Sequence, residues 1–213
     1  MPQHFKPSAR GKPQPGKAVA RAGQAKHNRV RIIGGTWRSR VIEFPDVEGL
    51  RPTANRVRET LFNWLGQTLH DKRCLDLFAG SGALGFEAAS RGASESVMLE
   101  VNAAAIAALK ANQQKLDAST CRIVPMDALK FIESGREKFD IIFIDPPFTS
   151  GLMATLLARL QKNLLDGGLL YAEWGAPIAD VLAEIANPQW EIVKQGRAGA
   201  VHCALLRCPD AIV

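Results

Sequence analysis

An aspartate followed by two prolines and a phenylalanine carries the clearest chemical information in this sequence. Residues 141–144 (Ile-Ile-Phe-Ile) form a short apolar run, which is typical of a strand buried on both faces of a parallel sheet. Because proline cannot donate to a strand ladder, Pro146 and Pro147 place Asp145 at the strand's carboxyl end, where open α/β sheets bind ligands. The Asp145 carboxylate, the Pro146 carbonyl and the Phe148 ring together suit a flat base that bears an amino group.

A glycine-rich segment, residues 76–85 (Asp-Leu-Phe-Ala-Gly-Ser-Gly-Ala-Leu-Gly), is the second feature with chemical meaning. It contains the spacing Gly-x-Gly-x-x-Gly, and Glu100 falls at the end of the next predicted strand, where an acid can bind ribose hydroxyls. A nicotinamide-dependent dehydrogenase therefore has to be considered. The glycine spacing by itself is weak evidence, because glycines also occur in simple tight turns.

Asp76, which opens this segment, favours a cationic ligand over a dinucleotide. Like charges about 6 Å apart repel by roughly 3 kcal/mol at an effective dielectric constant near 20, so a pyrophosphate is disfavoured there. S-adenosylmethionine carries an ammonium and a sulfonium group and no phosphate. Asp76 can bind its amino end, Glu100 can bind its ribose, and the backbone of Gly80 and Gly82 can approach it closely.

Strands and helices alternate from residue 73 onward, which predicts a doubly wound α/β fold with a mostly parallel sheet. The apolar patterns predict strands at 74–78, 96–99, 121–124, 141–144 and 169–172, and helices at 82–91, 103–116, 128–132, 153–164 and 178–185. The end of the chain differs. Residues 190–194 and 201–206, joined through 196–199, predict an antiparallel hairpin.

The preceding segment predicts a small N-terminal extension at residues 29–70. Residues 30–33 and 40–44 flank Gly-Gly-Thr-Trp and predict a β-hairpin with basic residues on its exposed face. Thr53 is a candidate N-cap of a helix whose apolar positions, from Val57 to Leu69, recur at helical spacing. Arg56 and Arg58 lie near its first turn, where the helix dipole disfavours cations, so they either contact a substrate or form ion pairs.

Composition excludes several other classes. The four cysteines contain no Cys-x-x-Cys and the four histidines are dispersed, so we expect neither a metal site nor a disulfide framework. No apolar run reaches the length of a membrane span, and we expect a cytoplasmic protein.

The first 42 residues contain ten Lys or Arg and no Asp or Glu, whereas the remainder carries 17 basic and 21 acidic residues. Residues 1–28 therefore predict a disordered basic leader that would either contact a polyanion or serve only as a solubilising tail.

Several motifs together resemble the bacterial RsmD family, which methylates guanine N2 in 16S ribosomal RNA. The resemblance covers roughly residues 29–206 and rests on Arg31-Ile-Ile-Gly-Gly-Thr-Trp37, Arg51-Pro-Thr53, Arg56-Val-Arg-Glu-Thr-Leu-Phe-Asn63, Leu75-Asp-Leu-Phe-Ala-Gly-Ser-Gly-Ala-Leu-Gly85 and Asp145-Pro-Pro-Phe148. It implies a Rossmann-like sheet of order 3-2-1-4-5-7-6 over residues 71–213, with the Asp76 and Asp145 strands side by side. It also implies that Asp127 and Ala128 contact the adenine, and that residues 51–58, including Arg51 and Thr53, help to close the cofactor site.

By this resemblance the partner is 16S ribosomal RNA or the assembling small ribosomal subunit, and we expect a monomer. Asp145, Pro146 and Phe148 are the expected catalytic residues, with S-adenosylmethionine as cofactor. The expected RNA contacts are Arg31, Arg38, Arg40, Arg56 and Arg58. Methylation of an amine on adenine, cytosine or a glutamine side chain remains open as an alternative. A non-catalytic RNA-binding module and a nicotinamide-dependent dehydrogenase rank below it.

The leader provides a first prediction. Deleting residues 1–28 should weaken RNA binding and flatten its salt dependence, because fewer phosphates are neutralised, and should leave S-adenosylmethionine binding intact. RNA titrations at several salt concentrations measure this effect. An unchanged salt slope would assign the leader to a solvated tail.

Overall fold

The computed structural model describes residues 27–47, 53–147, 151–185 and 189–208. The predicted disorder of the leader, together with the expected roles of Arg51 and Phe148, lies outside these residues. None of the helices that the structure describes is long and apolar enough to cross a membrane.

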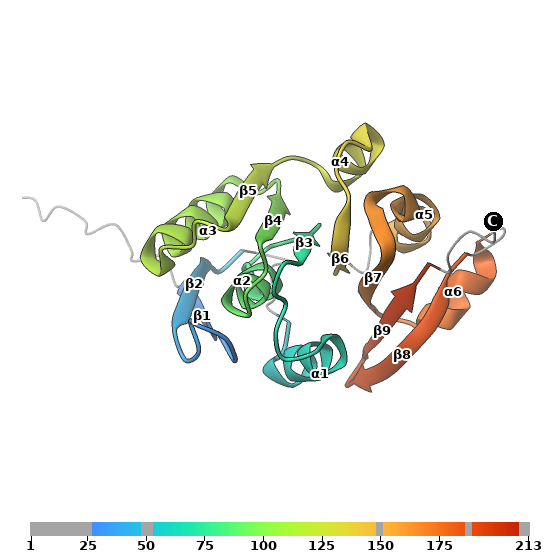
Figure 1. Ribbon diagram of the computed structural model, residues 1–213, viewed down its shortest axis with the longest axis horizontal. Helices are drawn as coiled ribbons and strands as arrows, with labels where there is room; N and C mark the ends of the chain where they lie inside the picture. Colours follow the sequence, from blue (N-terminus) through green and yellow to red (C-terminus); the bar gives the residue numbers. More distant parts are fainter. Residues whose placement is uncertain (1–26, 48–52, 148–150, 186–188, 209–213) are drawn as a thin grey trace, which may run out of the picture.

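A seven-stranded sheet forms the centre of the molecule (Figure 1). Its strands are β3 (Arg73–Asp76), β4 (Glu95–Glu100), β5 (Cys121–Pro125), β6 (Phe139–Ile144), β7 (Leu164–Trp174), β8 (Glu191–Ala198) and β9 (Val201–Arg207). They lie in the order β5-β4-β3-β6-β7-β9-β8, which confirms the order 3-2-1-4-5-7-6. The first five strands pair in parallel, and β9 pairs antiparallel with both β7 and β8. The predicted C-terminal hairpin is therefore confirmed.

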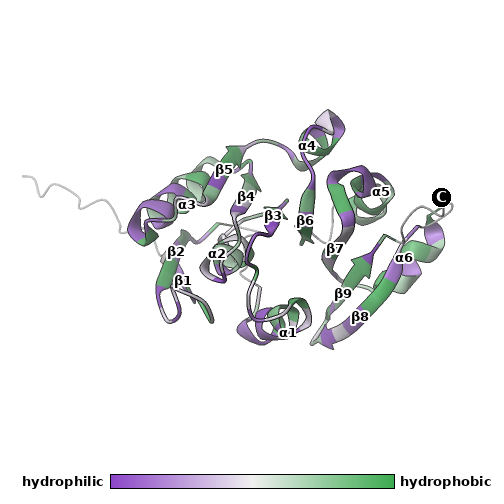
Figure 2. Cartoon of the chain, viewed as in Figure 1, coloured by the Kyte–Doolittle hydropathy of each residue, from purple (hydrophilic) through white to green (hydrophobic). Residues whose placement is uncertain are grey.

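Helices cover both faces of the sheet because its central strands are apolar on both sides. Ile142 and Ile144 pack with α4 (Ala128–Ser134), α5 (Leu152–Arg159) and α6 (Ile178–Glu184). Ile141 and Phe143 face the opposite side, which is covered by α1 (Asn55–Leu65), α2 (Ala83–Ser90) and α3 (Ala103–Leu116). In Figure 2, β6 is hydrophobic along most of its length, whereas α3 alternates between hydrophilic and hydrophobic residues. The apolar run at 141–144 thus predicted a doubly covered strand correctly.

The N-terminal hairpin consists of β1 (His27–Arg31) and β2 (Val41–Pro45), which pair antiparallel. It forms its own two-stranded sheet beside α2 and α3. Ile42 and Phe44 bury their side chains against Phe86 of α2. The hairpin that was predicted from the two segments flanking Gly-Gly-Thr-Trp is therefore confirmed.

Some boundaries differ from those predicted. Thr53 does not cap α1, because the helix begins after Ala54 and has no side-chain cap. The helix ends at Leu65, so Leu69 lies beyond it although its side chain is buried. β7 begins at Leu164, five residues before the predicted start, because a register shift opposite Phe139 and Ile141 lets the strand continue. The apolar pattern of a single segment cannot detect such irregular pairing between strands.

A buried carboxylate joins the N-terminal extension to the sheet. Glu87, on α2, is fully buried and accepts the backbone N–H groups of Ile33 at 2.8 Å and Gly34 at 2.7 Å. It also accepts hydrogen bonds from the guanidinium groups of Arg58 at 3.3 Å and Arg91 at 2.9 Å. One side chain therefore links the hairpin, α1 and α2.

The expected RNA contact of Arg58 is wrong because its side chain is fully buried. Besides Glu87, its guanidinium donates to the carbonyl of Arg31 at 2.8 Å and to the Asn55 side chain at 2.6 Å. Arg58 therefore forms an ion pair, which the sequence left open as the alternative to a substrate contact. Arg56, two residues earlier, is exposed.

Glu87 provides a second prediction. Glu87→Ala should lower the free energy of unfolding by roughly 3–5 kcal/mol, because it leaves two buried guanidinium groups without their carboxylate. Glu184→Ala, at an exposed position of α6, serves as the control and should change stability by no more than about 0.5 kcal/mol. Urea unfolding of both variants measures the difference. Equal stability of the two would contradict the structural role of Glu87.

Candidate active site

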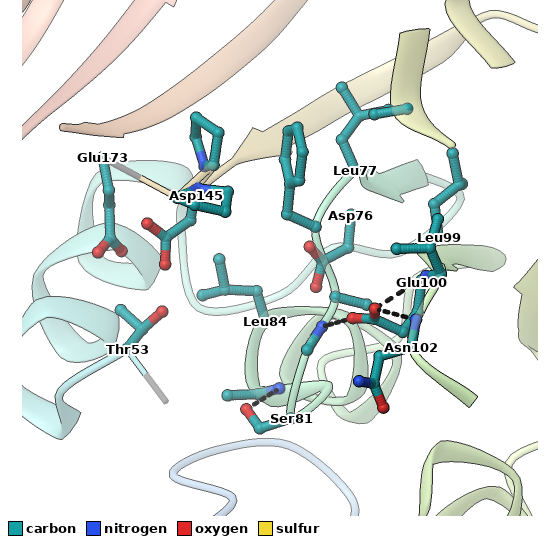
Figure 3. A pocket seen from close by; sticks show the side chains of 18 of the residues that line it. Thr53, Asp76, Leu77, Ser81, Leu84, Leu99, Glu100, Asn102, Asp145 and Glu173 are labelled. Atoms are coloured by element: carbon teal, nitrogen blue, oxygen red, sulfur yellow. Dashed lines mark hydrogen bonds between the residues drawn. The ribbon is translucent and has the colours of Figure 1, made fainter. Parts of the chain in front are cut away.

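A pocket of about 660 Å³ opens at the carboxyl ends of β3, β4, β6 and β7 (Figure 3). Parallel pairing brings these ends together: β3 lies between β4 and β6, and β6 lies beside β7. The pocket is thus located at the switch point of the sheet, where α/β proteins bind ligands. Thr53 and Ala54, which precede α1, form another part of its wall.

The glycine-rich loop connects β3 to α2 along this pocket. Gly80 and Gly82 have positive φ values of 49° and 78°, which glycine adopts without the steric cost of a side chain. A Cβ atom on Gly82 would lie only 2.7 Å from the Phe86 ring, so this position has no room for a side chain. Gly80 lines the pocket, whereas Gly82 is buried at the start of α2.

Glu100 holds this loop against the end of β4. Its Oε2 accepts the Gly80 N–H at 2.9 Å, and its Oε1 accepts those of Val101 and Asn102, both at 2.8 Å (Figure 3). A carboxylate offers about four acceptor positions, so one remains for a ligand hydroxyl. The sequence indicated a ligand contact for this residue but not its role in fixing the glycine loop.

Asp76 lies beneath the same loop and is 3% exposed. Its Oδ2 accepts the backbone N–H of Gly85 at 3.1 Å. Burial above all, with the charges of Asp145 and Glu100, raises the pKa of Asp76 to about 7, although the N–H groups of Gly85 and Phe78 oppose the shift. A bound cation would restore the ionised form, because opposite charges favour the charged state of a carboxyl group.

Asp145 and Glu173 form a pair of neighbouring carboxyl groups in the pocket, on the side of Asp76 opposite to Glu100 (Figure 3). Burial raises the pKa of Asp145 to about 6. Burial and the charge of Asp145 raise the pKa of Glu173 to about 8, while the hydroxyl groups of Tyr171 and Thr53 oppose this shift. At neutral pH the pair therefore carries about one negative charge, mainly on Asp145.

The charge of the pocket wall limits what can bind. Its described lining includes five acids (Asp76, Glu100, Asp127, Asp145 and Glu173) and no Lys, Arg or His. Such a wall favours ligands that are positively charged or rich in hydrogen-bond donors, and it disfavours the phosphates of a dinucleotide. No group of three or more potential metal ligands occurs among residues 27–47, 53–147, 151–185 and 189–208.

Comparison with known proteins agrees with this fold and site. A family model described as Conserved hypothetical protein 95 matches residues 30–207. Ribosomal RNA small subunit methyltransferase D of Escherichia coli strain K12 is 46% identical over 146 residues, which cover 68% of this chain and 74% of that protein. The protein of the same name from Haemophilus influenzae is 39% identical over 183 residues, covering 83% and 92%. The chain belongs to the RsmD family.

A solved structure supports the same relationship. The Escherichia coli protein yhhF superposes with a TM-score of 0.73 at 40% identity, covering 85% of this chain and 98% of that chain. The family membership expected from the sequence motifs is therefore confirmed, together with the Rossmann-like methyltransferase fold.

Most of the expected site residues of this RsmD family member meet in one pocket. Its lining includes Thr53, Asp76, Gly80, Glu100, Asp127, Ala128, Asp145 and Pro146. Asp127 also caps α4, since its Oδ1 accepts the Lys130 N–H at 3.1 Å.

Four of the five arginines expected to contact RNA are exposed and lie outside the pocket lining: Arg31, Arg38, Arg40 and Arg56. Arg40 donates a hydrogen bond to the Lys115 carbonyl.

Glu173 follows the predicted strand at 169–172, where capping or packing explains an acid as well as a pocket role does. The structure places its side chain in the pocket and hydrogen-bonds it to Tyr171. The available signal was its position at the carboxyl end of an apolar strand, the same signal that identified Asp145.

Glu100 provides a third prediction. Glu100→Ala should weaken binding of S-adenosylmethionine by about 1–3 kcal/mol, because it removes a ligand acceptor and three bonds that hold the glycine loop. Glu100→Gln should weaken it less, since its amide oxygen still accepts. Isothermal titration calorimetry measures both affinities, and circular dichroism verifies folding. Unchanged affinity in a folded Glu100→Ala variant would contradict the assignment.

Proposed function

We propose that the chain transfers a methyl group from S-adenosylmethionine to the N2 amine of a guanine in small-subunit ribosomal RNA. One observation carries the proposal: an acidic pocket, whose described lining contains no basic residue, joins the glycine-rich loop to Asp145 and Pro146. The names of the Escherichia coli and Haemophilus influenzae relatives agree with ribosomal RNA as substrate.

The cofactor half of the pocket suits S-adenosylmethionine. Asp76 pairs with the amino group, Glu100 accepts from the ribose, and Asp127 and Ala128 lie beside the adenine. Val101 and Met126, which also line the pocket, are 68% and 41% exposed and provide apolar surface for the adenine ring. When bound, S-adenosylmethionine supplies an electrophilic methyl group on a positively charged sulfur.

The other half of the pocket binds the amine. Guanine N2 is a weak nucleophile, because its lone pair is delocalised into the ring. Asp145 and the Pro146 carbonyl accept its two hydrogens, which favours a pyramidal nitrogen with an available lone pair. As the nitrogen–carbon bond forms and the sulfur–carbon bond breaks, the amine loses a proton, which Asp145 accepts. Positioning of the two substrates and stabilisation of the developing charge provide most of the rate.

RNA reaches this pocket with its target base turned out of the helix, because N2 is otherwise stacked and paired. Phe148 stacks on that base. The exposed arginines of the hairpin, Arg31, Arg38 and Arg40, together with Arg56 at the start of α1, contact phosphates. The substrate is 16S ribosomal RNA or the assembling small subunit.

Two measurements test this function. Mass-spectrometric mapping of small-subunit ribosomal RNA from cells with and without the gene should show one N2-methylguanosine that depends on the gene. Calorimetry should detect binding of S-adenosylmethionine and none of NAD, because the pocket repels phosphates. Loss of a methyl mark from adenine or cytosine instead of guanine would overturn the guanine assignment.

Asp145 provides a fourth prediction. Asp145→Ala should retain its fold and its affinity for S-adenosylmethionine but lose single-turnover methyl transfer by about 10²–10³-fold, typical for removal of a preorganised polar group. Asp145→Asn should retain more activity than Asp145→Ala, since its amide oxygen accepts one hydrogen bond.

The same residue determines a pH dependence. The Asp145 pKa is raised to about 6, so its carboxyl group becomes protonated as pH falls through 6 and can then no longer take up the proton that the amine loses. Single-turnover rates should therefore fall below about pH 6 in the parent protein. The Asp145→Asn variant should show no such fall in rate near pH 6, because its amide group does not titrate there. A near-parental rate in folded Asp145→Ala would remove the residue from the mechanism.

A further inference from the structure

Glu173 occupies the same position on β7 that Asp145 occupies beyond β6. In the parallel ladder Ile144 pairs with Ala172, so Asp145 and Glu173 take the next register position on neighbouring strands. Neighbouring strands lie about 4.8 Å apart. Figure 3 shows both carboxyl groups projecting into the pocket beside Thr53 and Leu84. The two acids can therefore contact adjacent atoms of one ligand.

Hydrogen bonds orient the Glu173 side chain. The Tyr171 hydroxyl donates to its Oε1 at 2.9 Å, and the Thr53 side chain lies across the pocket from its carboxyl group (Figure 3). Tyr171 is fully buried, and its ring packs edge-on against Phe143. These contacts come from the strand core and from the segment before α1, so they limit the rotamers that Glu173 can adopt.

Stability does not explain a carboxyl group at this position. Glu173 is 4% exposed and forms no ion pair within the part of the chain that the structure describes. Its charged neighbours in the pocket, Asp145 and Asp76, are acids and repel it. A buried acid among like charges is destabilising, and such arrangements are concentrated at functional sites.

We propose that Glu173 accepts a hydrogen bond from the ring N1–H of the target guanine, beside the N2 amine that Asp145 contacts, and so selects guanine. This inference rests on the proposed function. In guanine the amine adjoins a ring nitrogen that donates, whereas in adenine and cytosine the nitrogen beside the amine accepts. Asp145 and Glu173 together therefore match two adjacent donors on the guanine edge.

The same contact rejects other bases. A ring N1–H facing Glu173 favours the ionised form of its carboxyl group. An ionised carboxylate only accepts, so an acceptor nitrogen in the same place would leave two lone pairs facing each other in a buried site. An unsatisfied buried polar group costs about 1–3 kcal/mol, which corresponds to roughly ten- to a hundredfold in kcat/KM. Asp145 alone does not provide this selection, because all three bases present an amine to it.

The test replaces the target guanosine, once mapped, with 2-aminopurine ribonucleoside in small-subunit ribosomal RNA. The analogue keeps the amine on C2, but its N1 is an acceptor. Methyl transfer to both RNAs is measured at pH 8.5, above the Glu173 pKa of about 8 and below the pH at which guanine N1 loses its proton, so that this carboxyl group is mostly ionised and accepts. The readout is the ratio of kcat/KM for guanosine to kcat/KM for 2-aminopurine.

The parent protein should prefer guanosine by roughly ten- to a hundredfold beyond the preference of Glu173→Ala. Glu173→Gln should also lose preference, because its amide group can turn and donate to the N1 of the analogue. Glu184→Ala, on the exposed face of α6, should keep the parental ratio. Calorimetry with S-adenosylmethionine and circular dichroism establish that each variant is folded.

A parental ratio in folded Glu173→Gln would overturn the inference, even where Glu173→Ala fails to fold. Equal rates of the parent protein on both RNAs would overturn it as well. Methylation of neither RNA by a parent protein that binds S-adenosylmethionine would overturn the proposed function itself, and this inference with it. Failure of the proposed function can be told apart from failure of this inference alone, because without methylation of either RNA there is no kcat/KM ratio to compare.

Discussion

Parallel pairing of β3, β6 and β7 is the constraint on which the site depends. Carboxyl ends of adjacent parallel strands meet at one edge of the sheet, so acids at three strand ends, Asp76, Asp145 and Glu173, necessarily face one pocket. Pro146 and Pro147 end β6 at the required point. The chain thereby concentrates negative charge where a cationic cofactor and a donor-rich base edge would compensate it.

Burial of these acids costs stability, and the backbone offsets part of that cost. N–H groups of the glycine-rich loop and its helix donate to Asp76 and Glu100, while the Tyr171 hydroxyl donates to Glu173. The pKa values of Asp76, Asp145 and Glu173 are nevertheless raised, chiefly by burial. Raised acid pKa values mean that the ligand-free protein becomes more stable as pH falls through about 8 to 6, since the folded state binds protons more tightly than the unfolded chain.

The N-terminal extension contributes to the site through α2. Glu87 ties the hairpin and α1 to the helix that the glycine-rich loop begins, and Thr53 reaches from the segment before α1 to Glu173. The exposed arginines of the hairpin therefore have a defined position relative to the pocket. This arrangement fits an RNA contact surface and a methyl-transfer site on one rigid frame.

The sequence by itself determined the sheet, its two faces and most of the pocket residues, because strand-end acids, glycines and prolines act through local backbone geometry. Only the tertiary structure decided the roles of Arg58, Thr53 and Glu173. Arg58 is buried because Glu87, 29 residues away, supplies its partner. Thr53 lines the pocket opposite Glu173, which lies on a distant strand, instead of capping α1. Such partnerships depend on which elements pack together, and residue spacing within one segment does not contain that information.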